Sequence, residues 1–285
     1  MYEPEVTIIT PTYNIVDEGL TDDFNLLITL LHKQTYPYIE HLIIDNASTD
    51  ETLMLLKEYK NSGLLNFYSE KDRGKFDAYN KGILRAKGQY LAFVSCDDFY
   101  HDVTGIMDVI NVMEEEDADF AFFPVYCVHP EGYVFLFMPS ILNVFQVPPC
   151  PRQALIVRKD VMNELNGFDE KFKMTADYDL IIRLFLNEYR GVFFDGNIMT
   201  CKVGKQIMTQ TVQCEAETKH IFYKNYKNMY SMTDEVLDRM VGLSEMPKPL
   251  LEQLVKKFPE EDYDLFYERY EEMYNIRKQA RANQR

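Results

Sequence analysis

The sequence lacks several patterns that would assign it to a familiar class. None of its five cysteines belongs to a Cys-x-x-Cys pair, and an odd number leaves at least one thiol unpaired within the chain. We therefore expect no structural zinc site, and a reducing cytoplasm is the simplest setting. No run reaches the roughly 18 apolar residues that span a bilayer. The N-terminus has no basic segment followed by an apolar one, so we expect no secretory signal.

Positive charge is also scarce. The chain has 30 Lys and Arg against 46 Asp and Glu, which gives a formal net charge of −16. A general nucleic-acid binder needs a basic surface to displace counterions, so nucleic acid is not expected as a partner. The same acidity gives no support for a broad attraction to anionic lipids. With 285 residues, 46% of them hydrophobic, the chain can build one large domain and a smaller appendage.

The first half alternates between strand and helix patterns. Strands are expected at 6–10, 41–45, 64–69, 90–95 and 119–125, and helices at 24–34, 52–60, 76–87 and 103–115. Ser48 and Glu51 have the spacing of a capping box before the second helix. This alternation predicts a parallel α/β sheet. Right-handed crossovers then bring the strand-end loops 11–14, 45–50 and 96–98 to one rim of the sheet.

The second half differs in composition. Prolines interrupt it near residues 139–151, before a strand at 153–158 and a helix at 159–165. Beyond about Gly204 we expect helices at 218–230, 234–241, 250–258 and 260–282, the last carrying an aromatic stripe that should pack. The predicted organisation is therefore a main domain over 1–204 and a helical extension over 205–285.

The strand expected at 90–95 ends in two carboxylates, Asp97 and Asp98. Open α/β sheets place ligands at the carboxyl ends of their strands. Hard cations such as Mg²⁺ or Mn²⁺ prefer oxygen ligands and often share them with a bound diphosphate. The pair therefore indicates a metal-diphosphate site. A solvated turn or a helix N-cap explains the same two residues, and the pattern alone leaves these alternatives open.

Six ordered motifs resemble those of one enzyme family. They are Thr7-Ile-Ile-Thr-Pro-Thr-Tyr-Asn14, Gln34-Thr-Tyr-Pro37, Ile43-Ile-Asp-Asn-Ala-Ser-Thr-Asp50, Asp77-Ala-Tyr-Asn-Lys-Gly82, Phe93-Val-Ser-Cys-Asp-Asp98, and Gly167-Phe-Asp-Glu170 followed by Ala176-Asp-Tyr-Asp-Leu180 with Arg183. From about residue 5 to 205 the chain resembles the family-2 glycosyltransferases, and most closely the bacterial members that build surface polysaccharide. The resemblance implies an inverting enzyme with a GT-A fold: a mostly parallel sheet flanked by helices, here with a helical C-terminal extension.

The resemblance also implies which residues bind the nucleotide sugar. The predicted set is Thr10, Pro11, Tyr13, Asn14, Asp45, Asp72, Asp77, Lys81, Ser95, Asp97 and Asp98. Asp97 takes the place of the metal-binding carboxylate, so Mn²⁺ or Mg²⁺ is the expected cofactor. Ser95 stands where the family usually has Asp or Asn, so the resemblance implies a weaker and neutral first polar contact at this position.

The remaining predicted roles concern catalysis and specificity. Asp177 is the candidate general base that takes the proton of the acceptor hydroxyl, and a helix-capping role is compatible with it. Asp179 and Arg183, four residues apart, are expected to form a structural pair. Arg152 stands where this branch often has His, so Arg152 and Gln153 are predicted acceptor or specificity positions.

The expected partners are a nucleotide-sugar donor, with UDP favoured, and a saccharide or lipid-linked acceptor. We expect a cytoplasmic location. Contact with the inner face of the membrane and a homodimer through the C-terminal helices are left open. One rival is an enzyme of another class, a nucleotidyltransferase or a dinucleotide-dependent dehydrogenase. The first strand-helix turn lacks the Gly-x-Gly-x-x-Gly of a dinucleotide fold, and no P-loop is present. A degenerate binding module with the same fold is the alternative.

Overall fold

The computed structural model describes residues 5–203, 211–243 and 245–282. They form two compact units. The first, here called the sheet unit, comprises Met1–Pro139, Cys150–Lys173 and Arg190–Gly204, and the second, the helical unit, comprises Ser140–Pro149, Met174–Tyr189 and Lys205–Arg285. The boundary predicted at Gly204 lies outside the described residues and stays a prediction.

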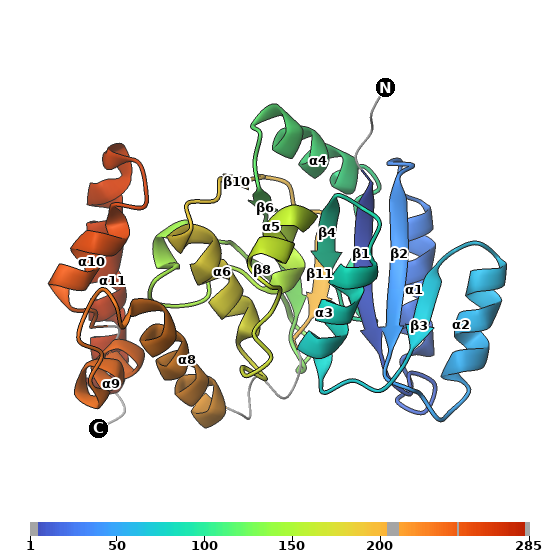
Figure 1. Cartoon of the computed structure of the whole chain (residues 1–285), viewed down its shortest axis with the longest axis horizontal. Helices are drawn as coiled ribbons and strands as arrows, with labels where there is room; N and C mark the ends of the chain where they lie inside the picture. Colours follow the sequence, from blue (N-terminus) through green and yellow to red (C-terminus); the bar gives the residue numbers. More distant parts are fainter. Residues whose placement is uncertain (1–4, 204–210, 244, 283–285) are drawn as a thin grey trace. The chain divides into compact units, whose positions relative to one another are not determined.

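The sheet unit is built on a seven-stranded sheet (Figure 1). Its strands, in the spatial order β10-β6-β9-β4-β1-β2-β3, are Gly191–Phe193, Phe120–Phe122, Leu155–Arg158, Tyr90–Phe93, Val6–Thr12, Ile39–Asp45 and Asn66–Ser69. Only β9 runs antiparallel to its neighbours β4 and β6. The predicted mostly parallel α/β sheet is therefore confirmed.

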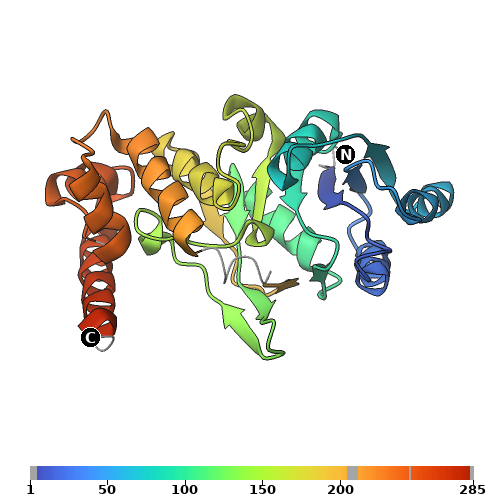
Figure 2. The same cartoon turned by 90° about the horizontal axis from the view of Figure 1, so that it is seen from below.

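Helices cover both faces of this sheet. They are α1 (Thr21–His32), α2 (Thr52–Asn61), α3 (Lys75–Arg85), α4 (Gly105–Glu115) and α5 (Lys159–Glu164). Figures 1 and 2 show α1 and α3 on opposite faces. The central strands β1, β2 and β4 are buried along nearly their whole length, as strands covered on both faces must be.

A second, four-stranded sheet has the order β5-β11-β7-β8. Its strands are Phe99–Tyr100, Met199–Lys202, Val125–Val128 and Val134–Phe137, and Figure 2 shows the β7–β8 hairpin in green. The single strand predicted over 119–125 is wrong: β6 and β7 belong to different sheets. Pro124 lies in the break between them, and proline cannot donate a ladder hydrogen bond.

The helical unit contains α6 (Ala176–Leu186), α8 (Thr211–Tyr226), α9 (Asp234–Leu243), α10 (Lys248–Val255) and α11 (Tyr263–Ala282). Of the stripe predicted on the last helix, Phe266 packs as expected, whereas Tyr270, Met273 and Tyr274 are half-buried. Phe266 is 2% exposed, and its ring lies 4.2 Å from Phe258 and 6.4 Å from Phe145, between centroids. Within the described ranges, we find no helix both long and apolar enough to cross a membrane.

The predicted capping box is wrong. Helix α2 has Glu51 as its N-cap, and that residue makes no side-chain capping bond. The Ser48 hydroxyl instead donates to Asp45 Oδ1 at 2.5 Å and accepts from the Asn14 amide at 2.8 Å. The Asp50 carboxylate takes the Thr52 amide at the start of the helix. The Ser48 hydroxyl is bonded to the nearby Asp45 carboxylate and therefore does not cap α2.

Candidate functional site

The loops after β1 and β2 lie side by side at the carboxyl edge of the sheet. Asn14 has a positive φ of 46°, a conformation that asparagine tolerates better than most residues. Its amide donates to Ser48 Oγ at 2.8 Å, and its side-chain oxygen accepts from the Thr49 amide at 2.8 Å. The predicted meeting of loops 11–14 and 45–50 at one rim is confirmed.

Asp45, at the end of β2, holds this rim together. It is fully buried. Its Oδ1 accepts from Thr12 Oγ1 at 3.2 Å and from Ser48 Oγ, and its Oδ2 accepts from Ser69 Oγ at 2.6 Å and from the Ser48 amide. The carboxylate thus joins the ends of β1, β2 and β3. Its predicted contact with the nucleotide stays a prediction, since both oxygens already have protein partners here.

Other predicted residues of the rim have contrasting environments. Thr10 is buried, and its hydroxyl lies 3.1 Å from His41 Nε2. Burial lowers the pKa of His41 to about 3, so this imidazole is neutral at pH 7. Tyr13 is 52% exposed, and Pro11 is partly exposed. Tyr13 and Pro11 therefore offer an accessible surface for a ligand, whereas the Thr10 side chain lies within the protein.

The segment before and within α3 forms a charged cluster. Asp77 is buried and accepts from the Arg73 amide and guanidinium, each at 2.9 Å. Burial pushes the pKa of Asp77 up, but the Arg73 hydrogen bonds and the Lys81 charge outweigh it and hold the pKa below its usual range. Lys81 Nζ lies 3.4 Å from Asp77 and donates to the Lys71 carbonyl. The Asp72 carboxylate accepts from the Gly74 amide, and burial raises its pKa.

The two carboxylates after β4 have different environments. Asp98 is 0% exposed. It accepts from the Ser95 amide at 2.7 Å, from Gln153 Nε2 at 3.0 Å and from the Lys202 amide at 3.2 Å. Burial raises its pKa to about 6, against the opposing charge of Arg152. Asp98 and Gln153 are therefore buried groups that stabilise the turn after β4 by hydrogen bonds. Their predicted contacts with substrates remain predictions.

Asp97 is the half-buried carboxylate of the pair. Burial raises its pKa, and the positive charges of Lys202 and Arg152 act in the opposite direction. Lys202 Nζ is itself 2.6 Å from Asp23 Oδ2. Of the two aspartates, Asp97 is the one that an incoming ligand can reach.

Arg152 and Ser95, two departures from the family pattern, lie in direct contact. The Arg152 guanidinium donates to Ser95 Oγ at 2.6 Å and to the Tyr79 hydroxyl at 2.9 Å. Arg152 is 8% exposed, in the short η2 turn (Arg152–Ala154) before β9. The sequence indicated each departure separately. Their contact spans 57 positions, so it becomes visible only when η2 is placed beside the end of β4.

The residues present can hold a divalent metal only if a bound diphosphate supplies further oxygen ligands. Among the described residues, no group of three or more His, Cys, Asp or Glu side chains has the arrangement of a metal site. Asp97 supplies one accessible carboxylate, while Asp98 is enclosed by N–H donors. A hard cation completed by diphosphate oxygens fits this set, because such ions often keep few protein ligands.

Asp177 belongs to the helical unit and lies in the first turn of α6. It is half-buried, and its Oδ1 accepts from the Tyr178 amide at 3.0 Å. The predicted pair of Asp179 and Arg183 is confirmed, with Arg183 Nε 2.8 Å from Asp179 Oδ2. Asp179 is therefore engaged in a structural ion pair, and Asp177 is the carboxylate of this motif that a substrate could contact.

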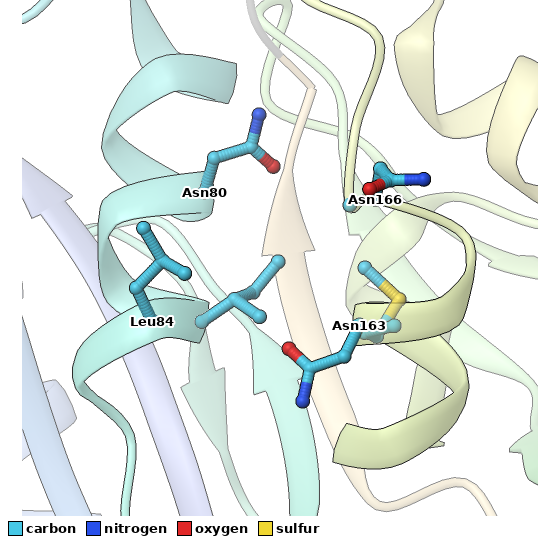
Figure 3. Close-up of a pocket in the computed structure, with 7 residues that line it drawn as sticks. Asn80, Leu84, Asn163 and Asn166 are labelled. Atoms are coloured by element: carbon cyan, nitrogen blue, oxygen red, sulfur yellow. The ribbon is translucent and has the colours of Figure 1, made fainter.

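A hollow of about 220 Å³ lies between α3 and the end of α5. Figure 3 shows Asn80 and Leu84 on one side and Asn163 and Asn166 on the other. The Asn80 side chain is bonded to the backbone of Phe168. None of the predicted site residues lines this hollow, so it is separate from the candidate donor site.

Comparison of sequences identifies related proteins. The model of Glycosyl transferase family 2 matches residues 7–159, more than half of the chain. An uncharacterized glycosyltransferase of Rickettsia prowazekii is 25% identical over 226 residues, covering 70% of this chain and 64% of its own length. A putative teichuronic acid biosynthesis glycosyltransferase of Bacillus subtilis, TuaG, is 34% identical over 99 residues, covering 34% of this chain and 37% of its own. The matches thus span less than two thirds of these relatives.

Solved structures share the fold across nearly the whole chain. Residues 1–349 of S. aureus TarS in complex with UDP-GlcNAc align with a TM-score of 0.64 at 16% identity, over 99% of this chain and 92% of that one. The mannosyltransferase PcManGT of Pyrobaculum calidifontis, in complex with GDP-Man and Mn²⁺, aligns with a TM-score of 0.61 at 18% identity, over 99% and 76%. These likenesses establish the mixed α/β fold of this chain as that of GT-A glycosyltransferases.

Proposed function

Because the chain belongs to glycosyl transferase family 2, we propose that it transfers a sugar from a nucleotide-diphosphate sugar to an acceptor hydroxyl with inversion. The favoured donor is a UDP-sugar, and the acceptor is a saccharide or lipid-linked saccharide in surface polysaccharide synthesis. The observation that carries the proposal is the accessible Asp97 carboxylate in the turn after β4. This strand runs parallel to β1, and the loops after β1 and β2 are joined by hydrogen bonds at the same edge of the sheet. The ligands named for TarS and PcManGT support a nucleotide-sugar donor.

In the proposed reaction Asp177 is the general base. It takes the proton of the acceptor hydroxyl as that oxygen forms a bond to the anomeric carbon. The bond from the anomeric carbon to the diphosphate oxygen breaks, and its electron pair leaves with the nucleoside diphosphate. Asp97 would hold Mn²⁺ or Mg²⁺, which supplies positive charge to the departing diphosphate. The rim loops of the sheet unit orient the donor.

A donor screen tests this proposal. Binding of UDP-, GDP- and dTDP-sugars is measured by isothermal titration calorimetry with Mn²⁺ and with EDTA, and release of nucleoside diphosphate is followed in parallel. We expect at least one donor to bind and to be hydrolysed slowly without acceptor. Binding with no turnover, tested also with saccharide acceptors, would favour the degenerate binding module. Failure of every donor to bind would overturn the enzyme assignment.

Arg152 is predicted to reduce the dependence of donor binding on metal. Its permanent charge lies at Ser95 on the turn that carries Asp97. Arg152→Gln should weaken UDP binding by about tenfold in EDTA, as expected for losing one charged partner, and by less with Mn²⁺. Arg152→Lys keeps the charge and should retain most of the affinity.

Titration calorimetry with UDP measures these differences. Arg158→Gln is the control, since Arg158 is a partly buried arginine away from the predicted site, and its Nε donates to the Ala118 carbonyl. It should leave UDP binding unchanged. Equal losses for Arg152→Gln and Arg152→Lys, independent of Mn²⁺, would show that Arg152 acts only by packing.

A further inference from the structure

Glu217 is a buried carboxylate on α8 that the proposed reaction does not use. It is 8% exposed. Its Oε2 accepts from the Met174 amide at 2.9 Å, the Thr175 amide at 3.0 Å and Thr175 Oγ1 at 2.9 Å. Its Oε1 accepts from Gln213 Nε2 at 3.1 Å. One side chain of the C-terminal helices thus binds the segment that leads directly into α6.

This contact fixes the segment just before α6, whereas the Tyr178 amide in the first turn is accepted by Asp177 Oδ1. The first amides of a helix have no partner within the helix, and a side chain of the N-cap residue normally takes one of them. Thr175 is the N-cap of α6, but it makes no capping bond of its own. Its hydroxyl donates to Glu217, which also takes two amides beside it. A negative charge at this end is favourable to the helix dipole.

A second contact between α8 and α6 lies two residues beyond Asp177. Asp179 is 0% exposed. It accepts from Lys224 Nζ at 2.9 Å and from Asn225 Nδ2 at 3.0 Å, in addition to its pair with Arg183. Helix α8 therefore holds α6 on both sides of Asp177, at residues 174–175 and at residue 179. The backbone that carries Asp177 has little freedom between these two attachments.

We propose that Glu217 is a positioning residue for the base Asp177, so that α8 contributes to catalysis by holding α6 in place. The inference rests on the proposed function, in which Asp177 takes the acceptor proton. Proton transfer requires hydrogen-bond distance, and a displacement of about 1 Å costs about a hundredfold in rate. Loss of the Glu217 contacts releases the start of α6 and moves the carboxylate from its place.

Steady-state kinetics of Glu217→Ala and Glu217→Gln test the proposal. Glu217→Ala should lower kcat by about ten- to a hundredfold, with donor affinity unchanged because the predicted donor residues belong to the sheet unit. Glu217→Gln keeps one acceptor oxygen and should lose less. The matched control is Glu215→Gln, which changes an exposed glutamate on the same helix and should leave kcat unchanged.

A double-mutant cycle separates positioning from general packing. Added to Asp177→Asn, Glu217→Ala should cause no further loss of kcat, because its effect passes through the base. Amide hydrogen exchange should accelerate at residues 174–178 in Glu217→Ala and stay unchanged in the sheet unit. Additive losses in the cycle, or an unchanged kcat in the single variants, would overturn the inference. Inactivity of the unchanged protein would instead overturn the proposed function, and with it the role of Asp177.

Discussion

An Asp177→Asn variant is expected to bind the donor normally and to transfer sugar about 10²- to 10⁴-fold more slowly, the usual contribution of a general base. Asparagine has nearly the same size but cannot take the acceptor proton. Asp177 is half-buried and accepts a hydrogen bond from the adjacent Tyr178 amide, which the side-chain oxygen of asparagine can also accept. The fold should therefore survive the change.

Single-turnover kinetics measures the expected loss of transfer rate, and donor titration measures the expected normal binding. Thermal melting serves as the structural check. Asp179→Asn provides the contrast, because Asp179 is 0% exposed and is enclosed by Arg183, Lys224 and Asn225. That variant should lower the melting temperature strongly. An Asp177→Asn protein with full transfer rate would remove Asp177 as the base.

An Asp97→Asn variant is expected to lose about 10²- to 10³-fold in kcat and most of its response to Mn²⁺. Asp97 offers the accessible carboxylate after β4, and an amide is a much weaker ligand for a hard cation. The stability of the folded state should not fall, since burial raises the pKa of Asp97 and therefore disfavours its charged form, which the variant lacks.

Asp98→Asn should instead lower the stability of the fold and leave the response to Mn²⁺ largely intact. The buried Asp98 accepts from three N–H donors, and an amide group would turn its own N–H₂ toward one of them. We expect a loss of about 1–3 kcal/mol in the free energy of unfolding. Urea denaturation and Mn²⁺ titration distinguish the two variants. If Asp97→Asn keeps its Mn²⁺ response while Asp98→Asn loses it at full stability, the assignment of the two aspartates is reversed.

Much of the fold could be predicted from local patterns. Apolar runs indicated β1, β2 and β4, and a helical pattern indicated α1, because the apolar side chains of each element must be covered. Since the rim loops follow parallel strands, their convergence also followed from topology alone. The family motifs then indicated Asp97 and Asp177 as the residues to test.

Local patterns failed where distant residues competed. Ser48 has the spacing of a cap, yet it bonds Asp45 and Asn14 because those groups are brought closer than the helix start. The strand predicted over 119–125 divides at Pro124, and the two halves join separate sheets. The contact between Asn14 and Ser48 spans 34 positions, and β6 pairs with β9 whereas β7 pairs with β11, so a short window of sequence does not contain these partners.

Residues close together in the chain are enough to establish the family, the alternation of strands and helices, and the few carboxylates that could bind a metal or take a proton. Which of these carboxylates a ligand can reach depends on the folded arrangement of the chain. It buries Asp45, Asp98 and Asp179 in hydrogen-bond networks. It also brings Arg152 to Ser95 over 57 positions and Glu217 to Thr175 over 42. Burial and long-range hydrogen bonding belong to the folded chain, so only the structure could show them.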